Sequence, residues 1–316
     1  MTTALYSHAD CKLHEMGGWH PESPARLQAI EDQLIASRIE RFLEYCEAPL
    51  ATDAMINRVH DAGVLEALRR QSPPLGSAPG TYRCLDADTS MNPHTFTAAL
   101  RAAGAAVAAT DAVLAGEFEN AFCAIRPPGH HARPSGPMGF CIFNNVAIAA
   151  RHALDVHGLE RVAIIDFDVH HGNGTAEAFR DDPRVLMTSF FQFPFYPYVD
   201  EEQPPAPAGH MLNQPLPAYS GGDVVRQLVT DAWLPALHAH RPQMLFISAG
   251  FDAHREDDLG QMCLVEADYA WITQQLMTVA AVHAQGRIVS CLEGGYHLSA
   301  LGRSVVAHVK ALAQLD

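Results

Sequence analysis

The sequence predicts an α/β fold with a mainly parallel sheet and helices on both of its faces. Four short runs are almost wholly apolar, as strands are when both faces of a parallel sheet are covered. Helix-like segments lie between or after these runs, and this alternation is typical of a parallel sheet. The 316 residues permit one large α/β domain, and length alone would also permit two. No convincing domain boundary is apparent, so we expect a single domain over residues 1–316.

The predicted elements follow one another along the chain. We expect strands at Ala121–Ile125, Val162–Ile165, Met244–Ile247 and Ile288–Leu292. We expect helices at Thr95–Leu114, Asn145–Val156, Val224–His238, Glu266–Val282 and Leu298–Leu315. The segment Phe190–Gly222 is rich in proline, glycine and aromatic residues. Its composition predicts a long loop with little regular structure that forms a wall or lid of a functional site.

Polar clusters follow all four predicted strands. In chain order they read RPPGHH, DFDVHHGNGT, SAGFDAH and EGGYH. Open α/β sheets bind ligands at the edge where the carboxyl ends of their strands lie. We therefore expect these clusters to converge in space.

The composition excludes some classes of partner. A formal net charge of −15 argues against nucleic acid, because phosphate binding needs clustered lysine and arginine. The acidity favours solubility, or attracts cationic substrates such as lysine tails and polyamines. Seven cysteines without a C-x-x-C pair indicate reduced thiols, and the N-terminus lacks the features of a signal peptide. Arg101 and Asp111 interrupt the most apolar stretch, so we expect a cytoplasmic protein with no membrane partner.

Two aspartates and two histidines follow the second predicted strand within six residues. Asp166, Asp168 and His170 alternate, so their side chains share one side of an extended backbone. A catalytic zinc site uses three protein ligands and leaves one position open. Asp168 and His170 supply two ligands, and Asp252 is the candidate for the third. These ligands fit Zn²⁺ or Fe²⁺, and their spacing does not choose between the two.

His130 and His131 stand in tandem in a loop stiffened by two prolines and a glycine. Histidine titrates near neutral pH, so the pair is suited to take a proton from water and return one to a leaving amine. Asp166 is a candidate to hold His130 by a hydrogen bond, and Asn173 to hold His131. Tyr296 is placed to donate a hydrogen bond to a developing oxyanion. The sequence does not reveal which histidine is the base and which is the acid.

These motifs, with GFCIFNN at 139–145 and HPESPAR at 20–26, strongly resemble the histone deacetylase, acetylpolyamine amidohydrolase and acetoin-utilisation superfamily. The resemblance covers nearly the whole chain, and HHGNGT and EGGYHLSALG look more like the class II branch. It implies the arginase/deacetylase fold, a three-layer α/β/α sandwich around a mostly parallel eight-stranded sheet. It also implies one deacetylase-like catalytic domain that removes acetyl or short acyl groups from acyl-lysine or similar linear acylamines.

The resemblance also assigns roles to residues. The zinc ligands would be Asp168, His170 and Asp252. His130 and His131 would be the general base and acid pair, and Tyr296 would polarise the scissile carbonyl. The family binds structural potassium as well, mostly through backbone oxygens. The matching positions are Asp166, Asp168, His170, Ser189 and Phe190 for one ion, and Phe179, Asp182 and Val185 for the other.

The substrate would enter an apolar tunnel whose two aromatic walls match Phe140 and Tyr196. Gly139 matches the floor that leaves space for the acyl-lysine stem, and Arg26 matches a buried arginine where released acetate would pass. Flat rings desolvate an apolar stem without demanding hydrogen bonds. In polyamine-selective relatives, an acidic gatekeeper lies seven residues after the last zinc-binding aspartate. Leu259 occupies that place here, which favours acyl-lysine.

The tunnel rim departs from the family pattern and leaves the substrate range open. Phe191 and Gln192 stand where relatives often carry His-Gln, and Pro197–Val199 followed by DEEQPPAPAG stands where they carry a glycine-rich stretch. Asp257 and Asp258, beside the gatekeeper position, keep a polyamine substrate open. The sequence also leaves open whether the chain forms a homo-oligomer.

Two competing interpretations come from other classes of protein. An arginase-like ureohydrolase would need two manganese ions and further carboxylates, but Asp252-Ala-His254 lacks the final aspartate and has Glu256 beyond it. Metal stoichiometry would distinguish the two enzymes. A catalytically silent binder of acyl-lysine should have lost a ligand, a histidine or the tyrosine, and none is missing.

Overall fold

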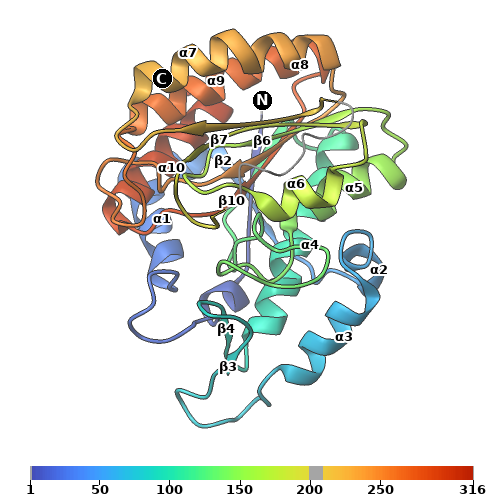
Figure 1. Ribbon diagram of the computed structural model, residues 1–316, viewed down its shortest axis with the longest axis vertical. Coiled ribbons are helices and arrows are strands. Elements are labelled where there is room, and N and C mark those ends of the chain that lie inside the picture. The colour runs from blue at the N-terminus through green and yellow to red at the C-terminus, as the bar shows by residue number, and fades with distance from the viewer. Residues whose placement is uncertain (1, 199–208, 316) are drawn as a thin grey trace.

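A computed structural model describes residues 2–198 and 209–315. They form a three-layer α/β/α sandwich around an eight-stranded sheet (Figure 1). Its strand order is β2-β1-β5-β10-β9-β6-β7-β8, and every neighbouring pair is parallel. The strands are β1 (Thr3–Ser7), β2 (Leu43–Glu47), β5 (Asn120–Cys123), β6 (Val162–Asp166), β7 (Val185–Gln192), β8 (Met211–Leu216), β9 (Leu245–Ala249) and β10 (Ile288–Leu292). The expected fold is confirmed.

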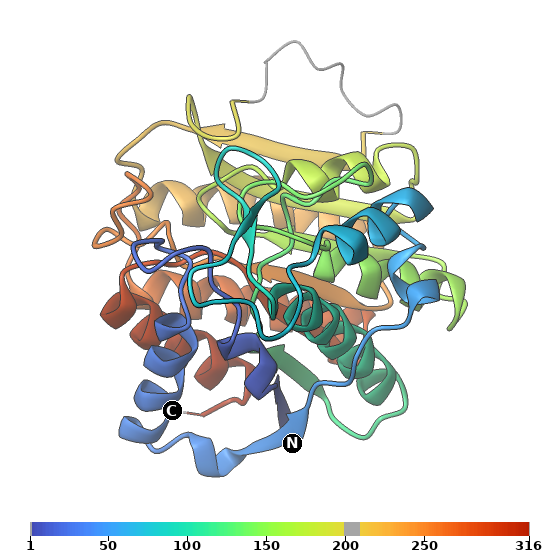
Figure 2. The same ribbon diagram turned by 90° about the horizontal axis from the view of Figure 1, so that it is seen from below.

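Helices cover both faces of the sheet. One face carries α1 (Ala25–Ala36), α7 (Gly222–Leu228), α8 (Leu234–His240), α9 (Glu266–His283) and α10 (Leu298–Leu312). The other carries α4 (Thr95–Leu114), α5 (Asn145–Asp155) and α6 (Asn173–Phe179). Beyond α4 lie α2 (Asp53–Ile56), α3 (Ala62–Gln71) and the hairpin of β3 (Arg83–Cys84) and β4 (Ser90–Met91). In the view from below, the segment around β3 and β4 lies in front of the sheet (Figure 2).

The central strands are buried on both sides because helices pack on each face. Along β6, Ala163 and Ile165 pack into one hydrophobic layer, and Val162 and Ile164 pack into the other. This alternation follows from the two-residue period of a strand. Apolar residues are therefore needed at successive positions, which is why the four central strands were visible in the sequence.

The predicted helices are present, and one of them differs from the prediction in its detail. The segment predicted as one helix from residue 224 to 238 is α7, a five-residue π-helical turn at Val229–Trp233, and α8. Pro235 lies in the first turn of α8 and has no amide hydrogen for a regular helical ladder. Within the described residues, α4 is the one helix long and apolar enough to cross a membrane, and 67% of its apolar window is buried in the protein.

The expectation of an irregular loop over Phe190–Gly222 is wrong at both of its ends. The strand β7 continues to Gln192, and β8 occupies Met211–Leu216. Among the described strands, β8 lies at the edge and pairs with β7 alone, and it stays partly exposed, so it has no continuous apolar run. Most of DEEQPPAPAG, within residues 199–208, lies outside the described residues.

Candidate active site

The polar clusters that follow β5, β6, β9 and β10 meet at one edge of the sheet. These four strands are neighbours in the order β5-β10-β9-β6, and all run in the same direction. Their carboxyl ends therefore lie side by side, where open α/β sheets bind ligands. Segments distant in sequence share this edge, as expected from the positions of the clusters.

Asp168, His170 and Asp252 lie at the centre of this edge. Their candidate ligand atoms are all within 4.8 Å of one another. His170 Nδ1 is 2.9 Å from Asp168 Oδ1 and 3.3 Å from Asp252 Oδ2. Backbone amides orient the carboxylates, because Val169 N donates to Asp252 Oδ1 at 2.9 Å and Gly294 N donates to Asp168 Oδ2 at 2.9 Å. Two carboxylates and an imidazole thus face a common point.

The electrostatics of this trio favour a bound cation. Both aspartates are buried, and Oδ2 of Asp252 has no hydrogen-bond partner among the described residues, although the His170 ring lies 3.3 Å away. Burial and the charge of Asp168 raise the pKa of Asp252 to about 7, although His170 opposes the shift. A divalent cation between the carboxylates would relieve their repulsion and give the unpartnered oxygen a ligand. Two carboxylates and an imidazole are suitable zinc ligands, so the residues present fit a zinc-type ion.

Two glycines make room for these carboxylates. A Cβ atom on Gly294 would collide with Asp252 Oδ2, and one on Gly250 would collide with Asp168 Oδ2. Both glycines follow the ends of strands that border the site. Any larger residue at either position would displace a carboxylate from the trio.

His130 and His131 lie beside the trio and have different partners. His130 Nδ1 is 2.9 Å from Asp166 Oδ2, and His131 Nδ1 is 2.7 Å from Asn173 Oδ1. These are the two hydrogen bonds that the sequence suggested. Because both partners accept through oxygen, we assign the ring proton to Nδ1 of each histidine, which leaves Nε2 for proton exchange.

The two histidines differ in electrostatic environment. Burial disfavours charge on His130, but the carboxylates of Asp168 and Asp166 outweigh burial and raise its pKa well above the usual value. Burial and the positive charges of His130 and His170 hold the pKa of His131 well below the usual value. The surroundings thus favour the charged form of His130 and the neutral form of His131.

Tyr296 follows the end of β10 and packs between two other predicted site residues. Its ring is edge-on to Phe140 with centroids 5.9 Å apart, and the Arg26 guanidinium carbon is 4.9 Å from the ring centroid. Burial raises the pKa of Tyr296 well above its usual value; Arg26 opposes this shift and Asp252 adds to it. The phenol therefore keeps its proton and remains a hydrogen-bond donor at neutral pH.

Arg26, matched by resemblance to an acetate pocket, holds the backbone that precedes Tyr296. Its Nε donates to Gly295 O at 2.6 Å, and its Nη2 donates to Glu293 O. Its Nη1 donates to Glu22 Oε1 at 3.1 Å. The side chains of Arg26 and Glu22 are fully buried, so this ion pair forms a rigid base beneath the tyrosine loop.

The predicted tunnel residues border the histidines. Tyr196 lies edge-on to His131, with ring centroids 5.2 Å apart, and to His170, with centroids 6.0 Å apart. Phe195, which the sequence analysis missed, stacks on His170 at 5.4 Å. Gly139 has φ of +55°, and a Cβ atom there would collide with the His131 ring. Glycine is therefore required at this position.

A hollow of about 460 Å³ opens beside Tyr296, and Leu259 and Asp258 are among the residues that line it. Asp257 also borders this hollow, but it is buried. Its carboxylate accepts hydrogen bonds from Tyr296 N at 2.6 Å and His297 N at 2.9 Å. Backbone amides therefore occupy the Asp257 carboxylate, which leaves Asp258 as the more accessible of the two acidic residues. Asp258 remains exposed.

The residues that match a first potassium site lie close together where β6 and β7 end. Asp166 pairs with Ser189 across the two strands, and Phe190 follows in β7. Asp168 and His170 continue the chain from β6 into the trio described above. These backbone segments are adjacent, as a shared ion would require.

The residues matched to a second potassium ion form the turn after α6. Asp182 N donates to Phe179 O at 3.0 Å, and Val185 N donates to Asp182 O at 3.1 Å. Hydrogen bonds from Arg184, together with the charge of Arg151, lower the pKa of the Asp182 carboxyl to about 2. Because Arg184 and Arg151 already bind that carboxylate, a potassium ion here would have to be bound by backbone carbonyl oxygens.

Glu293 is a site residue that the sequence analysis did not single out within EGGYH. It accepts hydrogen bonds from Gly129 N at 2.6 Å, His130 N at 3.0 Å and Ser248 Oγ at 3.0 Å. Burial raises its pKa to about 7. Glu293 thereby ties the histidine loop to β9 and β10. The sequence feature that could have identified Glu293 was its place as an acidic residue directly after a wholly buried strand.

Comparisons with known proteins agree with this geometry. A family model described as histone deacetylase domain matches residues 20–312. A histone deacetylase-like amidohydrolase of Pseudomonas aeruginosa is 39% identical over 295 residues, covering 89% of this chain and 76% of that protein. The human polyamine deacetylase HDAC10 is 36% identical over 331 residues, covering 99% of this chain and 48% of that protein. The crystal structure of the HDA15 HD domain matches with a TM-score of 0.90 at 32% identity, covering 99% of this chain and 88% of that one. The chain therefore belongs to the histone deacetylase family.

Proposed function

We propose that this deacetylase hydrolyses acyl-lysine or similar linear acylamines at a single metal centre formed by Asp168, His170 and Asp252. One observation carries the proposal. Two buried carboxylates and an imidazole meet at the shared strand edge, and one carboxylate oxygen there has no hydrogen-bond partner within residues 2–198 and 209–315. The tandem histidines and Tyr296 surround this point, so the groups needed for amide hydrolysis are gathered in one place.

We propose Zn²⁺ as the ion, with Fe²⁺ as the alternative, because both accept carboxylate and imidazole ligands. When bound, such an ion polarises a carbonyl oxygen and lowers the pKa of water towards neutrality. A two-manganese arrangement would need more carboxylates. Glu256, the candidate for an additional ligand, instead makes two 3.0 Å hydrogen bonds with Arg303 at the surface.

We assign proton exchange to His131. An imidazole held by a carboxylate retains its proton more firmly than one held by a neutral amide, and Asp166 holds His130 whereas Asn173 holds His131. His131 Nε2 would therefore take a proton from the attacking water and deliver one to the departing amine. His130 would remain charged and stabilise the negative charge that develops on the substrate.

Other parts of the proposal concern the protein as a whole. We propose one catalytic domain over residues 1–316, structural K⁺ at one or both of the matched positions, and a cytoplasmic location with reduced thiols. The seven cysteines are free in the structure. Phe140 and Tyr196 would form the walls that exclude water from an apolar substrate stem.

A panel of substrates tests the proposed function. We expect turnover of acetyl-lysine peptides to exceed that of acetylated putrescine, cadaverine and spermidine, because Leu259 offers no charge to a distant ammonium group. Rates for the purified chain with Zn²⁺ would be measured for each substrate, with a chelator-treated sample as the control. Absence of amide hydrolysis for every member of the panel would contradict the function, and a strong polyamine preference would contradict the substrate choice.

The substrate choice also depends on one side chain. Leu259→Glu should shift relative kcat/KM towards acetylated spermidine by about tenfold, equivalent to about 1.4 kcal/mol. Leu259→Gln has similar size without charge and should leave the ratio near that of the wild type. An equal shift in both variants would show that shape, not charge, controls selection.

Asp257 is expected to act as a positioning residue for Tyr296. Asp257→Asn replaces a carboxylate that accepts hydrogen bonds from three backbone amides, two of them in the tyrosine loop, so kcat should fall about tenfold with little change in KM. Steady-state kinetics with an acetyl-lysine peptide would measure both constants. Asp231→Asn makes the same change at an exposed position outside the site and should have no effect. A rise in KM without a fall in kcat would contradict a role in positioning the tyrosine.

A further inference from the structure

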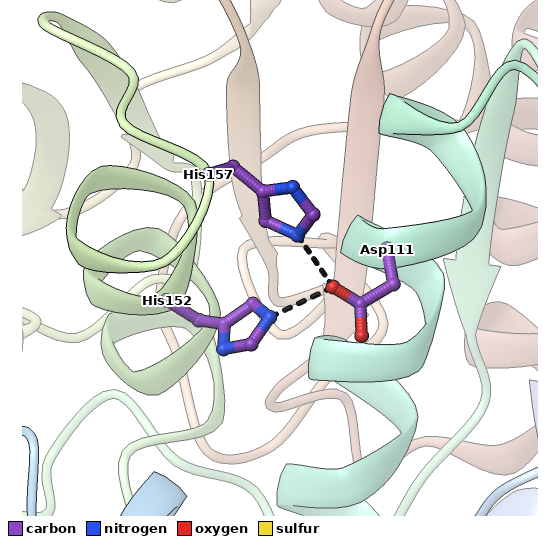
Figure 3. A group of neighbouring side chains, drawn as sticks. All are labelled: Asp111, His152 and His157. Atoms are coloured by element: carbon purple, nitrogen blue, oxygen red, sulfur yellow. Dashed lines mark hydrogen bonds and ion pairs between the residues drawn. The ribbon is translucent and has the colours of Figure 1, made fainter.

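Three side chains meet on the helical layer, at the opposite end of α5 from the active site. Asp111 lies on α4, His152 lies on α5, and His157 lies just beyond the end of α5 (Figure 3). At the other end of α5, Asn145 binds the active-site loop through Pro127 O at 3.2 Å. The cluster is therefore separate from the hydrolytic centre.

The three side chains present their polar atoms to one another. Asp111 Oδ1 lies 2.7 Å from His152 Nε2 and 2.6 Å from His157 Nε2 (Figure 3). The imidazole rings are inclined at 70°, with centroids 5.2 Å apart, so they converge on the oxygen rather than stack. All three candidate ligand atoms lie within 4.8 Å of one another. Two imidazoles and a carboxylate are a ligand set that zinc-type cations accept.

Burial makes one side of the cluster rigid and leaves the other side accessible. The His152 side chain is 7% exposed, and its Nε2 contacts Asp111. Its Nδ1 has no hydrogen-bond partner in the part of the chain that the structure describes. The side chains of Asp111 and His157 are 47% and 32% exposed. An ion could therefore enter from solvent and keep water at its remaining positions.

We propose that Asp111, His152 and His157 form a second divalent-cation site of the zinc type. The ion links α4 to the end of α5 and serves a structural purpose. It lies outside the hydrolytic centre, so its loss should leave the chemistry of that centre intact.

Equilibrium dialysis of the full chain against micromolar Zn²⁺, followed by elemental analysis, tests this site. The wild type should bind one equivalent more than His157→Asn or Asp111→Asn, while both variants deacetylate an acetyl-lysine peptide within about twofold of the wild-type rate. This difference in bound zinc between the wild type and each variant does not depend on how fully the hydrolytic centre is occupied. His238→Asn is the matched control, because His238 lies in an exposed histidine pair, 2.9 Å from His283. It should retain the wild-type stoichiometry.

A second measurement separates metal binding from folding. In Asp252→Asn protein, which lacks a ligand of the hydrolytic centre, Zn²⁺ should still raise Tm, and adding His157→Asn should abolish that rise. Equal zinc content in the wild type and both single variants would overturn the proposal and leave the cluster as a hydrogen-bonded contact. A Zn²⁺-induced Tm rise that survives in the double variant would overturn it as well.

Discussion

Asp252→Asn should abolish deacetylation and remove one equivalent of bound metal. The asparagine side chain has the same shape but lacks the charge that holds a cation, and Asp252 Oδ2 makes no hydrogen bond within the described residues. Metal assistance contributes several kcal/mol to the reaction, so the rate should fall about 1000-fold or more. Elemental analysis and turnover of an acetyl-lysine peptide would measure the two effects on the same sample.

The variant should fold, which distinguishes loss of metal from loss of structure. Burial and Asp168 raise the folded-state pKa of Asp252 to about 7, above the ordinary 3.8. Ionisation of Asp252 therefore destabilises the metal-free wild type as pH rises from about 4 through 7, and asparagine avoids this loss. Above pH 7, Tm of the metal-free variant should equal or exceed that of the metal-free wild type. Asp268→Asn, at a buried aspartate on α9, should keep both metal and activity. Full activity in Asp252→Asn would rule out the proposed centre.

The central strands and the position of the site were predictable from sequence because burial constrains them strongly. β6 packs against helices through Ala163 and Ile165 on one face and Val162 and Ile164 on the other, so polar residues are excluded from these four positions. Polar groups then appear abruptly where the strand ends. In a parallel sheet all such ends share an edge, and adjacency of β5, β10, β9 and β6 brings the four clusters together.

The edge strands were not predictable in this way because one side of each lacks a neighbouring strand. β2 pairs only with β1, and three of its five residues are exposed. β8 likewise pairs only with β7 and contains Pro215, which a central strand would not tolerate. Neither segment shows the apolar run that identifies a buried strand. β7 is wholly buried, but its hydroxyl residues Thr188 and Ser189 interrupt the run.

Side-chain direction is the other property that the sequence did not contain. Asp257 and Asp258 are adjacent acidic residues, yet one carboxylate turns inward to Tyr296 N while the other residue stays exposed. Asp111 and His152 are 41 positions apart and belong to no motif, and they meet only because α4 packs against α5. Such contacts depend on helix register and rotamers, which tertiary packing decides.

Tyr296→Phe should lower kcat about 100-fold or more while leaving bound metal and KM nearly unchanged. Loss of a single oxyanion donor has an effect of this size in other hydrolases. The phenol suits that role because burial holds its pKa well above the usual value and keeps it protonated. Phenylalanine preserves the packing against Phe140 and Arg26, so substrate binding should survive. Steady-state kinetics and elemental analysis would separate the three quantities.

Tyr269→Phe provides the matched control for this change. Tyr269 is fully buried on α9, and its hydroxyl has no hydrogen-bond partner in the described structure. Removing that hydroxyl should leave the rate unchanged and should not reduce stability, because an unsatisfied polar atom is lost. A large fall in rate for Tyr296→Phe beside a normal rate for Tyr269→Phe would therefore locate the effect at the active-site phenol. Near-normal turnover in Tyr296→Phe would mean that other groups, such as His130, stabilise the oxyanion without it.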